Sequence, residues 1–142
     1  MPQEIAVVGI GKEENQQDVW ISYQYKTLSE VPHGSLVGTS SARRVAQLFG
    51  LYPHIKAVPM RGNLQTRLAK MKEQELAGII LAASGMIRMG YIDQIQDYIS
   101  LDHFVPAVGQ GYLGITGRKE DSFEFLSNWQ DALVWTKMTA LR

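Results

Sequence analysis

The chain of 142 residues contains no cysteine. This absence excludes disulfides, thiolate metal sites and a cysteine that could serve as nucleophile or cofactor anchor. The three histidines, His33, His54 and His103, stand far apart without the spacing of a metal site. Apolar runs of the length of a membrane-spanning helix are also lacking, and residues 1–8 have neither the basic start nor the apolar stretch of a signal peptide. We therefore expect a cytoplasmic protein that binds no metal and no membrane.

Net charge is lacking as well, but the charges are segregated. Fourteen Lys and Arg balance fourteen Asp and Glu, yet the window from Arg43 to Arg88 holds eight basic residues against only Glu73 and Glu75. A neutral total argues against non-specific binding to nucleic acid, whereas the local excess of positive charge can focus a field on a small anion. The composition, 45% apolar and 20% charged, is typical of a globular protein.

Short apolar runs alternate with amphipathic segments along most of the chain. The expected strands are residues 5–10, 18–23, 35–38, 55–60, 78–83, 103–108 and 112–116, and the expected helices are 41–51, 64–74, 85–98 and 121–138. This order predicts an α/β fold with a largely parallel sheet and flanking helices. We expect a single domain over residues 1–142, closed by a C-terminal helix within 120–142.

Three strand-like runs are each followed by a helix-capping residue and then by arginine. The three sets are Ser40 with Arg43 and Arg44, Asn63 with Arg67, and Ser84 with Arg88. A cation in the first turn of a helix is unfavourable by about 0.3–1 kcal/mol, so the repeated pattern predicts a bound anion. The carboxyl ends of parallel strands meet at one edge of a sheet, and we expect at least three of the guanidinium groups to face one cleft there. The alternative is a set of solvated surface arginines.

Two other motifs have plainer interpretations. Gly109, Gly111 and Gly114 match the letters of a dinucleotide-binding loop, but the residues that follow do not begin a helix, so we favour a glycine-rich turn. Residues 41–54 have the length of a helix-turn-helix, but no second amphipathic helix follows Pro53, which argues against DNA binding. No histidine is placed to activate Ser40 or Ser41, so we interpret both as capping or anion-binding hydroxyls.

Four motifs occur in the order and spacing of a known family. They are Gly38-Thr39-Ser40-Ser41-Ala42-Arg43-Arg44, Arg61-Gly62-Asn63-Leu64-Gln65-Thr66-Arg67-Leu68, Ala83-Ser84-Gly85-Met86-Ile87-Arg88-Met89-Gly90 and Pro106-Ala107-Val108-Gly109-Gln110-Gly111. Together they strongly resemble porphobilinogen deaminase (hydroxymethylbilane synthase), with Ala42 where the family usually has Leu. Upstream, the segment from Gly11 to Val19 resembles the family's crossing from its first domain into its second, so the resemblance covers nearly the whole chain.

The resemblance implies a transferase of tetrapyrrole (heme) biosynthesis, which joins four porphobilinogen units into hydroxymethylbilane with loss of ammonia. Family members are usually monomeric and have three domains. This chain resembles the second domain, which is similar to one lobe of a periplasmic binding protein, with residues of about 1–22 and 104–118 as interdomain crossing strands. By the same resemblance, the catalytic aspartate and the cysteine that carries the dipyrromethane cofactor lie outside the chain. We therefore expect no catalytic residue here and no turnover by this chain alone.

The resemblance also implies tasks for individual side chains. It assigns the dipyrromethane cofactor to Thr39, Ser41, Arg43, Arg44 and Arg67, and the substrate or growing polypyrrole to Arg61, Arg67 and Arg88. The implied partners are porphobilinogen, linear polypyrroles and the missing first and third domains. The end of the chain lies near the family's boundary with the third domain, as in a domain fragment or a truncated gene product. Two alternatives stay open: a stand-alone, non-catalytic binding module for a small polycarboxylate, and a fragment that folds but binds nothing.

Overall fold

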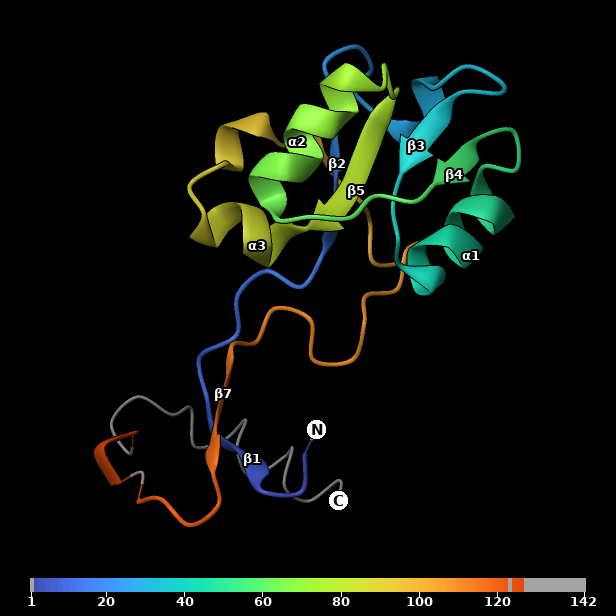
Figure 1. Cartoon of the computed structure of the whole chain (residues 1–142). Coiled ribbons are helices and arrows are strands. Elements are labelled where there is room, and N and C mark those ends of the chain that lie inside the picture. Colours follow the sequence, from blue (N-terminus) through green and yellow to red (C-terminus); the bar gives the residue numbers. More distant parts are fainter. Residues whose placement is uncertain (1, 123, 127–142) are drawn as a thin grey trace. The chain divides into compact units, whose positions relative to one another are not determined.

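The computed structural model describes residues 2–122 and 124–126 (Figure 1). The chain divides into two compact units, Asn15–Gln110 and the pair of segments Met1–Glu14 and Gly111–Arg142. The helix expected within 120–142 lies mostly outside the described residues, of which Glu124–Leu126 form a short 3-10 helix, η3. The expectation of a single domain over 1–142 stays a prediction.

The larger unit is built on a five-stranded sheet in the order β4-β3-β5-β2-β6. The strands are β2 (Asp18–Ile21), β3 (Leu36–Gly38), β4 (Lys56–Val58), β5 (Gly78–Ala82) and β6 (Asp97–Tyr98). β3 pairs in parallel with β4 and β5, whereas β2 pairs antiparallel with β5 and β6. Only β2 therefore runs against the others, and the expected α/β fold with a largely parallel sheet is confirmed.

Three α-helices follow the parallel strands: α1 (Ala42–Leu51), α2 (Leu64–Glu73) and α3 (Ala83–Arg88). Among the described residues, none of the helices combines the length and apolarity that crossing a bilayer requires. Short 3-10 helices, η1 (Leu28–Glu30) and η2 (Ile92–Gln94), complete the unit. The bounds of α1 and α2 agree with the sequence prediction to within one residue.

Two of the predicted elements are wrong. The helix expected over 85–98 ends at Arg88, because Gly90 adopts a φ of 74°, a left-handed conformation that commonly ends a helix. The chain then forms η2 and the short β6 instead. The strand expected over 103–108 is a series of turns and extended residues in which Phe104 is buried, and no ladder forms there.

Alternate side chains of the central strands pack on opposite faces of the sheet. Val19, Ile21 and Ile79 join the core under α2 and α3, whereas Trp20 and Ile80 join the core that contains Leu48 of α1. Gly78 lies against Trp20: a Cβ at this position would overlap the indole ring and the carbonyl oxygen of Ile21. The sheet thus separates two apolar layers, with a glycine where β5 passes the tryptophan.

The smaller unit contains a two-stranded antiparallel ladder. β1 (Ile5–Ile10) pairs with β7 (Gly114–Arg118), and the register shifts between Val7 and Gly9. Leu126 is buried in this unit, and its Cδ1 lies 3.4 Å from the position that a Cβ on Gly9 would occupy. Gly114 begins a strand rather than a helix, so the glycines from 109 to 114 lack the helix that a dinucleotide loop requires.

Candidate functional site at the carboxyl ends of the parallel strands

Two of the three predicted helix caps are present. Ser41 caps α1 by accepting the backbone N–H of Arg44 at 3.4 Å, and Asn63 caps α2 by accepting that of Thr66 at 2.8 Å. The third prediction is wrong. Ala82 is the N-cap of α3, so Ser84 is buried inside the helix. Arg88 consequently lies in the last turn of α3, where a cation is favourable rather than costly.

The hydroxyl groups before α1 serve the loop itself. Ser40 Oγ accepts the backbone N–H of Met60 at 2.7 Å and donates to the carbonyl oxygen of the same residue at 2.8 Å. Thr39 is buried, and its Oγ1 accepts the backbone N–H of Ser41 at 3.3 Å. These bonds fix the loop that follows β3 to the loop that follows β4.

A buried carboxylate, Asp18 at the start of β2, lies against the arginines of α1. Arg43 Nη1 is 2.7 Å from Asp18 Oδ2, and Arg44 donates to Oδ1 through Nε at 3.0 Å and Nη2 at 2.8 Å. Gln110 Nε2 donates to the same Oδ1 at 2.9 Å. Asp18 has no solvent exposure. Its single negative charge is shared between the positive charges of Arg43 and Arg44 and compensates only part of them.

The ionised form of Asp18 is stabilised by its neighbours. Burial alone would raise its pKa, but the hydrogen bonds from Arg43 and Arg44, the charge of Arg44 and the Gln110 amide together hold that pKa below the ordinary value of 3.8. Sequence reasoning missed both Asp18 and Gln110 as site residues. The available signal was the presence of one acidic residue at the head of an otherwise apolar strand.

The guanidinium groups of Arg43 and Arg44 are largely engaged within the protein. Besides Asp18, Arg44 donates through Nη1 to the carbonyl oxygen of Ile80 at 3.2 Å. Arg43 donates to the carbonyl oxygen of Val105 and, through Nη2, to Gln110 Oε1 at 3.2 Å. A guanidinium has five N–H donors, so a large part of the donor capacity of each of these arginines is used within the protein.

The segment that returns from β6 is tied to α1 by side-chain amides. Gln47 Oε1 accepts the backbone N–H of Val105 at 2.6 Å, and Gln47 Nε2 donates to the carbonyl oxygen of Val105 at 3.1 Å. Gln110 Nε2 also donates to the carbonyl oxygen of Gln16 at 2.7 Å. Arg43, Gln47 and Gln110 therefore hold this segment in place although it forms no strand.

A cavity of about 330 Å³ opens where α2 begins and β5 ends. Arg44 and Arg67 contribute to its wall, together with the α2 cap Asn63 and apolar side chains that include Leu64 and Met86. Arg67 Nε donates to the carbonyl oxygen of Gly62 at 2.8 Å. The cavity thus joins two of the arginines predicted from the sequence, on different helices.

The other three predicted arginines lie elsewhere. Arg43 is directed at Asp18, and Arg61 contributes to a separate cavity of about 740 Å³ between α1 and β4. Arg88 is exposed and is not part of the wall of either cavity. The cavity beside α2 therefore holds two guanidinium groups, one fewer than the three expected.

Comparison with known proteins identifies the family. The sequence family described as "Porphobilinogen deaminase, dipyromethane cofactor binding domain" matches residues 1–124. The chain belongs to the porphobilinogen deaminase family. It is 45% identical over 120 residues to the porphobilinogen deaminase of Alkaliphilus metalliredigens, covering 84% of this chain and 38% of that protein. It is 42% identical to the enzyme of Neisseria meningitidis serogroup A, covering 100% of this chain and 46% of that protein.

These porphobilinogen deaminase relatives are longer proteins, and the chain spans less than half of their length. The description of the matching family refers to binding of the dipyrromethane cofactor. Among solved structures, a Bacillus subtilis lipoprotein assigned to methionine binding superposes with a TM-score of 0.52 at 14% identity, covering 98% of this chain and 62% of that one. This likeness concerns the fold, which is the type expected from the sequence.

Proposed function

We propose that this chain supplies the carboxylate-binding half of the active cleft of a hydroxymethylbilane synthase. The observation that carries the proposal is the cavity beside α2, because it combines the guanidinium groups of Arg44 and Arg67 with apolar side chains. A pyrrole unit with acetate and propionate groups needs both an apolar wall for its ring and cationic donors for its carboxylates. Cofactor, substrate and growing chain share this chemistry.

The residues present fit the carboxylates of a dipyrromethane but not its covalent attachment. The remaining N–H donors of Arg44 and the guanidinium of the half-buried Arg67 can hold carboxylates, whereas the chain has no thiol to carry the cofactor. When bound, the cofactor supplies the pyrrole that is extended. The contribution of this chain is to bind, orient and neutralise carboxylates, with Asp18 and Gln110 as residues that position Arg43 and Arg44.

The roles of Thr39, Ser41, Arg43, Arg61 and Arg88 in cofactor or substrate binding stay predictions from the family resemblance. The internal bonds of Thr39 and Arg43 favour a positioning role for both residues. Arg61 and Arg88 are not part of the wall of the cavity that contains Arg67.

A chimera tests the proposal. Residues 1–142 replace the corresponding region of the Neisseria meningitidis relative, which aligns over the whole chain. We expect the chimera to release ammonia from porphobilinogen and the isolated chain to release none. A folded chimera without cofactor and without turnover would contradict the proposal, and sustained turnover by the isolated chain would contradict its dependence on further domains.

The same experiment separates the alternative of a stand-alone polycarboxylate-binding module. In that case the isolated chain would bind a linear polypyrrole, but the chimera would remain inactive.

The chimera that carries Arg67→Gln provides the residue-level control. We expect it to retain its fold and to lose activity, because Arg67 shares the cavity with Arg44 and makes no ion pair with Asp18.

A further inference from the structure

The outer face of α1 carries an apolar stripe that does not pack on the sheet. Ala42, Val45, Ala46 and Phe49 recur at the spacing of one helix face. All four are exposed, with Phe49 at 71% and Val45 at 37%. The buried residue of the helix, Leu48, lies on another face. The large aromatic side chain of Phe49 is thus exposed to solvent and belongs to neither apolar layer of the unit.

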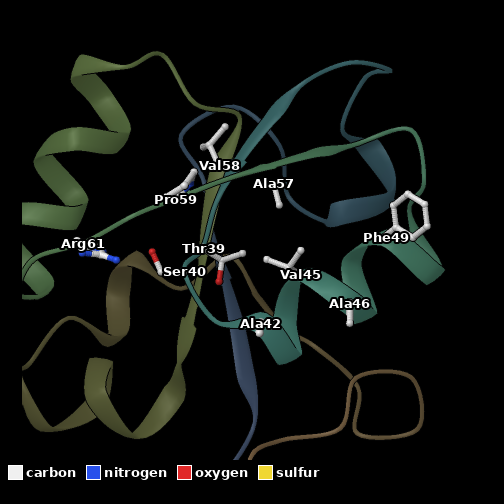
Figure 2. A pocket seen from close by; sticks show the side chains of 10 residues that line it. All are labelled: Thr39, Ser40, Ala42, Val45, Ala46, Phe49, Ala57, Val58, Pro59 and Arg61. Carbon is white, nitrogen blue, oxygen red and sulfur yellow. The ribbon is translucent and has the colours of Figure 1, made fainter.

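This stripe forms one wall of the 740 Å³ cavity, as Figure 2 shows. Ala57, Val58 and Pro59 form the facing wall. Phe49 lies toward one end, and Arg61 lies toward the other. Within the part of the chain that the structure describes, the Arg61 guanidinium has neither an ion pair nor a hydrogen bond. The groove therefore combines apolar walls with a free cation at one end.

Two kinds of occupant fit this groove poorly. Lys56 and Val58 bond to β3, through Lys56 N–H to Ser35 O at 2.9 Å and Thr39 N–H to Val58 O at 2.9 Å. In a parallel ladder, this leaves only the backbone N–H and C=O groups of Ala57 facing away from β3, and Pro59 has no N–H group. A peptide that added a strand to the edge of β4 would therefore find only one residue with which to form hydrogen bonds. A second copy of the chain would bring like charges together. An adjoining cavity of about 360 Å³ shares Val45 and Phe49 with the groove and includes Lys56, so a symmetric contact would place the Arg61 and Lys56 side chains of the two copies near each other.

We propose that the groove between α1 and β4 binds a small ligand with an apolar, preferably aromatic, body and one carboxylate. The carboxylate pairs with Arg61, and the body rests between Val45 and Phe49 on one side and Ala57 on the other. The volume is typical of small-molecule sites, which are mostly apolar with a few polar groups that fix orientation. This cavity is separate from the cavity of Arg44 and Arg67, and its test changes neither of those two residues.

The probe is 2-naphthylacetate, and its neutral counterpart is 2-naphthylacetamide. Calorimetric titration of the full chain should show saturable binding of the acid, with the amide about two- to fivefold weaker, as expected for the loss of one exposed ion pair. Arg61→Gln should lower the affinity for the acid to that for the amide and leave the affinity for the amide unchanged. Absence of acid binding, or equal binding of acid and amide by the parent chain, would overturn the proposal.

Two variants test the apolar walls. Val45→Asp should weaken both compounds at least about tenfold, since it places a charge between the walls of the groove. Leu51→Asp is the matched control, because Leu51 is also exposed on α1 but is not part of the wall, and it should bind like the parent chain. If Val45→Asp fails to fold, Phe49→Ala replaces it, with an expected loss of about two- to tenfold. Parent-like affinity in the wall variant would overturn the proposal.

Discussion

Arg44 holds Asp18 through two donors on one carboxylate oxygen, with Nε at 3.0 Å and Nη2 at 2.8 Å from Oδ1. A guanidinium that meets a single oxygen in this way keeps its orientation on α1 while the other carboxylate oxygen serves Arg43. The two arginines predicted to bind a ligand are therefore first of all partners of a buried acid.

Asp18→Asn should destabilise the protein by about 3 kcal/mol or more, because it leaves two partly buried guanidinium groups without a counter-charge. Urea unfolding followed by tryptophan fluorescence measures the change. Asp93→Asn is the matched control, since Asp93 is exposed on η2, and its midpoint should stay within error of the parent. Equal midpoints for both variants would show that the Asp18 cluster does not stabilise the fold.

Stability should depend on acid pH through the same residue. The folded-state pKa of Asp18 lies below 3.8, so its contribution is complete above about pH 4 and is lost as pH falls through the lower, folded value. The difference in unfolding free energy between the parent and Asp18→Asn should therefore shrink as pH is lowered from 5 toward 3. A difference that grows over this range would contradict the depressed pKa.

Gly78→Ala should cost about 1–3 kcal/mol, because its Cβ would overlap the Trp20 ring and the backbone of Ile21. Gly50 provides the contrast within the same unit. A Cβ there meets no atom within 4 Å, and Gly50→Ala in α1 should be neutral or stabilising by up to about 0.5 kcal/mol. Thermal unfolding of the two variants measures both effects, and the opposite ranking would show that the contact at Trp20 is absent.

Arg67→Gln should weaken binding of a linear polypyrrole carboxylate about two- to fivefold, which is the effect of one exposed ion pair. Affinity of the parent should fall as salt rises. A linear tetrapyrrole should bind more tightly than porphobilinogen, since several cations act on one molecule. Arg118→Gln, on the exposed surface of β7, should bind like the parent. Fluorescence titration at two salt concentrations decides the matter, and the same loss in both variants would exclude a specific role for Arg67.

The elements predicted best from the sequence are those defined by local interactions. α1 and α2 have amphipathic patterns and side-chain caps, Ser41 and Asn63, whose bonds reach only three residues ahead. The predictions failed where the structure of a segment depends on a backbone conformation or on contacts with residues far away in the sequence. Gly90 stops α3 early through its positive φ. The 104–110 segment is held by Gln47 and Arg43 instead of by a strand partner.

The site was predictable only in part, for a related reason. The loops that follow β3 and β4 could be located from cap and arginine spacing, and Arg44 and Arg67 do share a cavity. The partner of Arg43 and Arg44 could not be located in this way, because Asp18 lies 26 residues before Arg44 on a strand that enters the sheet antiparallel. The periodicity of a single sequence does not show which strand an antiparallel strand such as β2 will pair with.

Ser40 exchanges two hydrogen bonds with the backbone of Met60, so a side chain continues the ladder between β3 and β4 after both strands have ended. The consequence is kinetic. The loop that leads into α1 and the loop that leads into α2 share this link, and a rearrangement of one requires the other to move. Relaxation-dispersion NMR should therefore report one common exchange rate for the backbone amides of Ser41 and Gly62, and Ser40→Ala should split it into two.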